Sequence, residues 1–113
     1  MIYTIYKITN NINNKVYIGF TQQALDKRLK QHINDANKSK GKRARVFYKA
    51  ILKHGGENFS IESIFESKSF EDCLFMETHF INEYHSFIDD HLCNGYNTTT
   101  GGIQAKKTQE LID

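Results

Sequence analysis

The sequence has few cysteines and no long apolar segment. Cys73 and Cys93 are too few for a disulfide framework and lack metal-ligand spacing, so we expect two reduced thiols. No stretch reaches the roughly 18 apolar residues of a membrane span, and residues 1–11 lack the apolar core of a signal peptide. These absences favour an intracellular protein, in the cytoplasm or in a host nucleus, over a secreted or membrane protein.

A large net charge is also lacking, because the 113 residues carry a formal net charge of only +2. The length fits one compact domain. With 39% hydrophobic and 25% charged residues, the composition is that of a globular chain and excludes a disordered one. We expect one domain over residues 1–102, followed by a charged tail or the start of a linker at 103–113.

The positive charge that is present gathers in one segment. This basic cluster consists of Lys38, Lys40, Lys42, Arg43 and Arg45. Such a cluster suits the phosphate backbone of a nucleic acid, and these five residues are candidate DNA-binding residues. From charge alone, a solvated loop explains the cluster equally well.

Two segments rich in β-branched and aromatic residues open the chain. Residues 2–9 and 15–19 are predicted strands, and the asparagines between them favour a turn. The pair therefore predicts an antiparallel hairpin. In the expected register Tyr6 lies roughly opposite Tyr17, so both rings share one face of the sheet, while Ile5 and Ile18 share the other.

The remaining periodicities predict three helices and a further strand. Helical spacing of apolar residues indicates a helix over 22–37 with Thr21 as its N-cap, and others over 45–54 and 70–84. The last of these opens with Ser69–Asp72, which resembles a capping box. Alternation predicts a strand from Phe59 to Phe65. The order β-β-α-α-β-α predicts an α+β domain, a small mixed three-stranded sheet flanked by helices.

Glu77 is a carboxylate within the apolar stripe of the third predicted helix, since it follows Leu74 by three residues and precedes Phe80 by three. A carboxylate that loses hydration there needs a cation or hydrogen-bond donors. A structural ion pair is one explanation. A hard cation such as Mg²⁺, shared with substrate phosphate oxygens, is the other.

The first predicted helix has a similar polar pair. Arg28 and His32 are four residues apart, so they lie on one face beside the apolar stripe. Arginine suits bidentate binding of phosphate. Singly, these two residues could simply border the core, Tyr6 and Tyr17 could be packing residues, and Asn97 could be a turn residue. Together with Glu77, they are the groups that metal-assisted phosphodiester cleavage requires.

The ordered motifs resemble those of the GIY-YIG nucleases. The resemblance covers about residues 2–102 and is strongest to the catalytic domains of phage and intron homing endonucleases and their free-standing viral relatives. One position departs from the signature, because Thr4 stands where the family has its first glycine. The motifs that carry the resemblance are Thr4-Ile5-Tyr6, Tyr17-Ile18-Gly19, Lys27–His32, Lys53-His54-Gly55, Glu77 and Gly95-Tyr96-Asn97.

The resemblance implies catalytic roles for six residues. Tyr6 would be the general base or relay the proton of the attacking water, and His32 would assist that transfer. Tyr17 would hydrogen-bond the phosphate or the nucleophile, and Arg28 would stabilise charge on the scissile phosphate. Glu77 would bind a divalent metal, Mg²⁺ or another such as Mn²⁺. Asn97 would orient neighbouring groups.

Tyrosine is a weak acid, so a tyrosine base needs help. With a pKa near 10, only about 0.1% of free tyrosine is ionised at pH 7. We hypothesise that Arg28, His32 and the metal make Tyr6 acidic enough to act.

Three functions remain open at the level of sequence. The first is a metal-dependent DNA endonuclease, which would need a transient dimer or two successive cuts to break both strands. The second is a catalytically silent nucleic-acid-binding module of the same fold. The third is an interaction domain whose basic loop docks an acidic partner.

Overall fold

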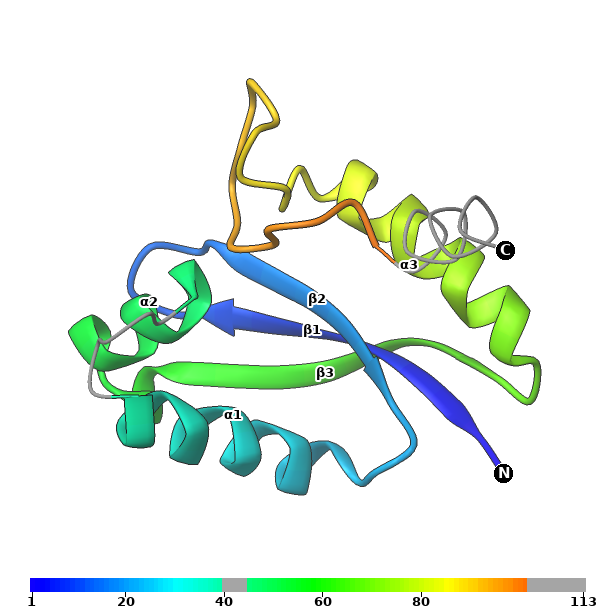
Figure 1. Ribbon diagram of the computed structural model, residues 1–113, viewed down its shortest axis with the longest axis horizontal. Coiled ribbons are helices and arrows are strands. Elements are labelled where there is room, and N and C mark those ends of the chain that lie inside the picture. Colours follow the sequence, from blue (N-terminus) through cyan, green and yellow to red (C-terminus); the bar gives the residue numbers. More distant parts are fainter. Residues whose placement is uncertain (40–44, 102–113) are drawn as a thin grey trace.

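The computed structural model describes residues 1–39 and 45–101 of the chain (Figure 1). Its elements follow the predicted order β-β-α-α-β-α, with one short 3₁₀ turn before the third strand. They are β1 (Tyr3–Asn10), β2 (Val16–Thr21), α1 (Leu25–Ser39), α2 (Val46–His54), η1 (Gly56–Asn58), β3 (Phe59–Ser67) and α3 (Phe70–Glu83).

The strands form one sheet in the order β2-β1-β3, with the N-terminal strand in the middle. The α+β class and the element order are confirmed. Both strand pairs are antiparallel, so the expectation of a mixed sheet is wrong in that detail. Thr4 pairs regularly with Thr21 and Glu66, which shows that the departure from the family signature leaves β1 intact.

The hairpin register differs from the prediction. Tyr6 pairs with Gly19, and Tyr17 pairs with Ile8, so the two tyrosines are diagonal neighbours and not opposite one another. The turn sets this register: the Asn14 N–H donates to the Asn10 carbonyl at 2.7 Å, and Asn14 adopts a φ of 65°. The predicted faces are nevertheless correct, because residues two apart in a strand share a face.

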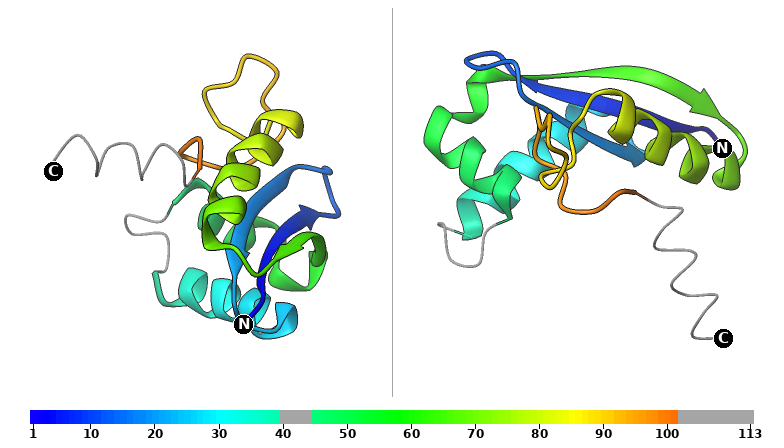
Figure 2. Two further views of the ribbon diagram at one scale, coloured as in Figure 1. Left: turned by 90° about the vertical axis from the view of Figure 1, so that its right-hand side faces the viewer. Right: turned by 90° about the horizontal axis from the view of Figure 1, so that it is seen from above.

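The tyrosine face of the sheet carries Tyr6, Ile8 and Tyr17 and is covered by α1 and α2, which pack against each other (Figure 2). Its fully buried residues include Phe47 and Ala36. The cluster is mainly aromatic at its centre, since the rings of Tyr17 and Phe47 stack with centroids 4.3 Å apart.

The α3 face carries Ile5 and Ile18 and packs against Cys73 and Ile81 of α3. Ser69 caps α3 as predicted, accepting a hydrogen bond from the Asp72 N–H at 3.2 Å. Both cysteines are free thiols, as expected from the sequence.

Two local predictions are wrong for identifiable reasons. Thr21 does not cap α1, because it ends β2 and its hydroxyl accepts from the Gln23 N–H in a short turn, so α1 begins only at Leu25. The pairing of β3 with β1 shifts register between Ile5 and Tyr6, and this shift breaks the simple alternation of side chains along β3. Phe65 therefore packs on the α3 face instead of sharing the face of Phe59.

Candidate active site

Tyr6 and His32 form a buried hydrogen-bonded pair between the central strand and α1. The Tyr6 side chain is 1% exposed and His32 is 0% exposed. The Tyr6 hydroxyl lies 2.8 Å from Nε2 of His32. Arg28, one helical turn before His32, donates from Nε to the same hydroxyl at 3.2 Å. The predicted Arg28/His32 face of the helix is therefore the one that meets Tyr6.

Gly19 makes room for the Tyr6 ring. A Cβ atom at Gly19 would lie 2.6 Å from Cζ of Tyr6 and would also meet the Tyr6 hydroxyl oxygen. Gly19 is paired directly with Tyr6 across the ladder, so its lack of a side chain lets the ring lie over the backbone of β2. The glycine thus fixes where the Tyr6 hydroxyl points.

Tyr17 lies at the edge of this pair. Its ring centroid is 6.4 Å from that of Tyr6 and 5.5 Å from the His32 ring. Stacking on Phe47 sets the plane of the Tyr17 ring, and the side chain remains partly exposed. Tyr6, Tyr17, Arg28 and His32 are therefore brought together, as predicted.

Burial sets the resting protonation of the central pair. Desolvation, and then the nearby charges of Arg28 and Arg45, lower the pKa of His32 to about 3, so the imidazole is neutral. Desolvation is also the main cause that raises the pKa of Tyr6 well above its ordinary value, and Arg28 offsets only part of it. Burial raises the pKa of Tyr17 as well. Without a metal, Arg28 and His32 therefore do not make Tyr6 acidic, and the hypothesis drawn from the sequence, which also requires the metal, stays a prediction.

Glu77 lies in α3. Its side chain is partly buried, in agreement with its place in the apolar stripe. Its negative charge contributes to the raised pKa of both Tyr6 and Tyr17, after burial in each case. The carboxylate therefore acts electrostatically on both tyrosines, although it comes from the helix that covers the other face of the sheet.

Asn97 binds the backbone of β2. Its Oδ1 accepts from the Ile18 N–H at 2.9 Å, and its Nδ2 donates to the Ile18 carbonyl at 2.8 Å. Beside it, the Tyr96 N–H donates to the Val16 carbonyl at 3.0 Å. This segment runs along the outer edge of β2 (Figure 1). Asn97 thus completes the edge strand next to Tyr17, and both ends of its amide are used there.

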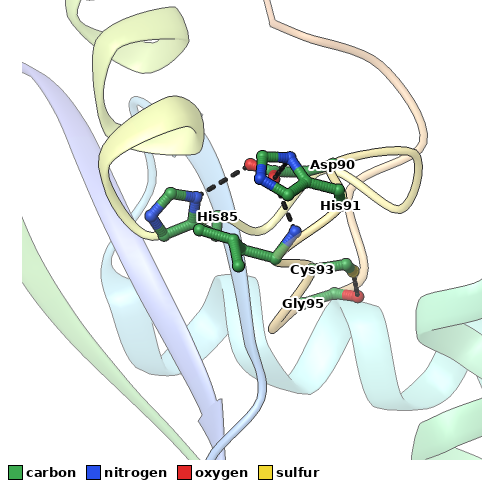
Figure 3. Close-up of polar contacts among 6 residues, drawn as sticks. His85, Asp90, His91, Cys93 and Gly95 are labelled. Carbon is green, nitrogen blue, oxygen red and sulfur yellow. Dashed lines mark hydrogen bonds and ion pairs between the residues drawn. The ribbon is translucent and has the colours of Figure 1, made fainter.

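The loop that precedes Asn97 is held by Asp90 (Figure 3). Its carboxylate lies 2.9 Å from Nδ1 of His85 and 3.7 Å from Nδ1 of His91, and it accepts from the Leu92 N–H at 2.9 Å. The Leu92 hydrogen bond, followed by His85, lowers the pKa of Asp90. These histidines therefore help to hold the loop in shape.

Arg45 has a closer relation to the site than its place in the basic cluster suggested. Its guanidinium lies 4.4 Å from the centroid of the Tyr48 ring and 6.0 Å from that of Tyr17. The signal in the sequence is that Arg45 precedes Tyr48 by three residues at the start of a helix, a spacing that brings side chains together. Lys38, the other described member of the cluster, is exposed in the last turn of α1; Lys40, Lys42 and Arg43 lie outside the described residues.

The described residues suit a metal that takes few protein ligands. Within 1–39 and 45–101, no group of three or more His, Cys, Asp or Glu side chains could hold an ion between them. A single partly buried carboxylate whose charge acts on two tyrosines, as at Glu77, fits a hard cation that completes its shell with water and phosphate oxygens.

The match of the sequence to a known family decides what this arrangement is. The GIY-YIG catalytic domain matches residues 2–100. The chain belongs to the GIY-YIG family. It is a GIY-YIG nuclease domain.

The relatives of this GIY-YIG domain include viral and phage proteins. It is 38% identical over 82 residues to putative MSV199 domain-containing protein 146R of Invertebrate iridescent virus 6, covering 71% of this chain and 32% of that protein. It is 35% identical over 102 residues to putative endonuclease segD of Enterobacteria phage T4, covering 90% of this chain and 40% of segD. The chain thus spans 32% to 40% of the length of these curated relatives.

Solved structures show the same fold. The catalytic domain of the intron endonuclease I-TevI, in a mutant form, superposes with a TM-score of 0.72 at 30% identity, over 89% of this chain and 97% of that one. A second structure of the catalytic domain of homing endonuclease I-TevI gives a TM-score of 0.69 at 30% identity, over 86% and 98%. Within the described residues, no helix has the length and apolar character needed to cross a membrane.

Proposed function

We propose that this GIY-YIG domain is a metal-dependent endonuclease that hydrolyses DNA phosphodiester bonds. The observation that carries the proposal is the buried hydrogen bond between Tyr6 and His32, with Arg28 donating to the same hydroxyl. Two polar side chains, His32 and Arg28, converge on the buried Tyr6 oxygen, and a glycine makes the space for it. Such an arrangement holds a proton-transfer group in place, which general acid–base catalysis requires.

The side chains divide the chemistry between them. Tyr6 removes the proton of the attacking water or relays it, and neutral His32 accepts the Tyr6 proton through Nε2. Arg28 stabilises charge on the scissile phosphate, and Tyr17, partly exposed at the rim, hydrogen-bonds the phosphate or the nucleophile. Asn97 holds the strand that carries Tyr17.

Glu77 is the residue that would hold the divalent cation, Mg²⁺ or Mn²⁺. When bound, such a cation supplies Lewis-acid stabilisation of charge on the phosphate and lowers the pKa of nearby acids. Burial keeps both Tyr6 and His32 neutral in the metal-free protein. This resting protonation fits a reaction that depends on the cation.

The proposal extends to the substrate and to the whole chain. The DNA backbone would be bound by the basic cluster, which consists of Lys38, Lys40, Lys42, Arg43 and Arg45. The protein would act inside the cell, where DNA is found. We assign residues 1–102 to the nuclease domain and 103–113 to a tail or linker. With one site per chain, breaking both strands would take a transient dimer or two successive cuts.

A plasmid-nicking assay in Mg²⁺ tests the proposal. We expect wild-type protein to convert supercoiled plasmid to the nicked form, and Glu77→Ala to abolish conversion while the protein stays folded. If the wild type does not cut but binds DNA with an affinity that falls steeply with salt, the domain is a silent binding module. Cleavage that persists in Glu77→Ala would remove that residue from the reaction.

A further inference from the structure

The hydrogen bonds of His32 continue past Tyr6 to another tyrosine. Nε2 of His32 lies 2.8 Å from the Tyr6 hydroxyl, and Nδ1 lies 3.3 Å from the hydroxyl of Tyr48 on α2. The imidazole is 0% exposed. Both ring nitrogens of a fully buried histidine are thus held by phenol groups, one from the central strand and one from a helix.

We propose that Tyr48 is a positioning residue of this active site, which holds the His32 imidazole with Nδ1 protonated and with Nε2 free to accept the proton of Tyr6. The inference rests on the proposed function, in which His32 serves Tyr6. It adds a residue that lies beyond the predicted catalytic set and acts through its hydrogen bond to His32.

A count of hydrogen-bond donors and acceptors supports the His32 tautomer with Nδ1 protonated. A neutral imidazole carries one N–H and one bare nitrogen. Arg28 can only donate to the Tyr6 oxygen, so the Tyr6 hydrogen needs an acceptor, and Nε2 of His32 is the acceptor within reach among the described contacts. Nδ1–H then donates to Tyr48. The opposite tautomer would leave the buried Tyr6 hydrogen without an acceptor, which costs free energy.

The surroundings of Tyr48 fix its ring and leave its hydroxyl a way to water. The Arg45 guanidinium lies over the ring, 4.4 Å from the centroid, and the rings of Phe47 and Tyr48 are 5.9 Å apart. Tyr48 is partly exposed, unlike Tyr6 and His32. After accepting from Nδ1, its hydroxyl can therefore donate its own hydrogen to solvent.

This chain of groups can move one proton out of the site without charging the histidine. The O–H bond of Tyr6 breaks as an N–H bond forms at Nε2 of His32. The Nδ1 proton passes to the Tyr48 oxygen, and the original Tyr48 proton leaves to water. His32 ends neutral in the other tautomer. Such a path suits a buried ring, since burial disfavours the imidazolium.

The first test uses metal-free, DNA-free protein, so it does not depend on activity. Nitrogen-15 NMR of labelled histidine shows which ring nitrogen carries the hydrogen, and His32→Gln assigns the His32 signals. We expect protonated Nδ1 in the wild type and a mixture of tautomers in Tyr48→Phe. Protonated Nε2 in the wild type, or the same tautomer in both proteins, would overturn the proposal.

The second test is kinetic, with Tyr3→Phe as the matched control, because Tyr3 packs on the α3 face. For Tyr48→Phe we expect kcat to fall about three- to tenfold, the value of one lost hydrogen bond, with KM within about twofold. The acid limb of the kcat–pH profile should shift in Tyr48→Phe and not in Tyr3→Phe. A wild-type kcat and pH profile in Tyr48→Phe would overturn the role. If the wild type itself fails to cut DNA, the proposed function fails, and the NMR result still decides whether Tyr48 positions His32.

Discussion

The tyrosine face of the sheet buries a histidine and a phenol among aromatic rings, whereas the buried set on the α3 face consists of isoleucines and one thiol. The same strands supply both faces, and residues adjacent in β1, Ile5 and Tyr6, point to opposite sides. A buried polar group needs partners in defined directions, while a buried isoleucine needs only volume. The comparison therefore indicates that the tyrosine face holds polar groups in fixed directions and the α3 face mainly supplies stability, with Glu77 as the residue that α3 would add to the proposed site.

The largest contrast should come from removing one hydroxyl on each face. Tyr6→Phe deletes the oxygen that joins His32 and Arg28, and we expect kcat to fall about 100- to 10,000-fold, the usual contribution of a general base. Tyr3→Phe makes the same chemical change on the α3 face and should leave kcat unchanged. Single-turnover cleavage in Mg²⁺ measures both. A Tyr6→Phe protein that cuts at the parental rate would exclude Tyr6 as base or relay.

Acid should destabilise the protein through the tyrosine face. The folded state holds the pKa of His32 near 3, below the ordinary value of 6.5, so the unfolded chain binds the extra proton. The stability that depends on neutral His32 is fully present above pH 6.5 and is lost as the pH falls towards 3. The loss is on the order of 4 kcal/mol. Urea unfolding at several pH values measures it.

His32→Gln is the control for this titration, because it removes the histidine and keeps a polar side chain. Its free energy of unfolding should depend less on pH between 6.5 and 3. On the α3 face, burial raises the pKa of Cys73, so that thiol stays neutral throughout this range. An equal pH dependence in His32→Gln and the wild type would show that other groups, such as the surface carboxylates, cause the acid sensitivity.

A methyl group added beneath Tyr6 should act on both stability and rate. Gly19→Ala places Cβ within 2.6 Å of the Tyr6 ring, which is 1% exposed and has little room to move. We expect a loss of about 1–3 kcal/mol of unfolding free energy from overpacking, and up to about a 100-fold fall in kcat from displacement of the hydroxyl. Thermal unfolding and cleavage rates measure the two effects.

Gly56→Ala is the matched control for Gly19→Ala. The added Cβ there meets three side-chain carbons of Ile33, with Cδ1 and Cγ2 at 3.0 Å and Cγ1 at 3.1 Å, and no tyrosine atom is among these nearest neighbours. It should cost less stability and leave kcat unchanged. If Gly19→Ala loses stability but keeps its kcat, Gly19 serves packing alone and does not place the Tyr6 hydroxyl.

The sequence was informative where structure is local or periodic. Helical spacing predicted the Arg28/His32 face and the partly buried Glu77, and strand alternation predicted which face each hairpin residue takes. The Ser69 cap was predicted for the same reason, since its partner lies three residues away. Such features depend on neighbours within one turn of helix or one strand.

Other features depended on contacts that no spacing encodes. The diagonal placement of Tyr6 and Tyr17 follows from the hydrogen bonds of the asparagine turn, which shift the register. The contact between His32 and Tyr48 joins two helices across a segment of the chain and depends on how those helices pack. The raised pKa of Tyr6 likewise follows from burial, which outweighs the nearby arginine that the sequence makes conspicuous.

The smallest expected effect compares two isoleucines of the same strand. Ile5 and Ile8 are both 0% exposed, but Ile5 packs on the α3 face and Ile8 on the tyrosine face. Ile→Val removes one methylene from each and should cost about 1 kcal/mol in both proteins. Because Ile8 belongs to the cluster that holds Tyr6 and Tyr17, Ile8→Val should also lower kcat a few-fold, while Ile5→Val should not. If Ile5→Val and Ile8→Val lose equal stability and have equal kcat values, small packing changes on either face do not alter the site. The hydrogen bonds around Tyr6 would then hold its geometry by themselves.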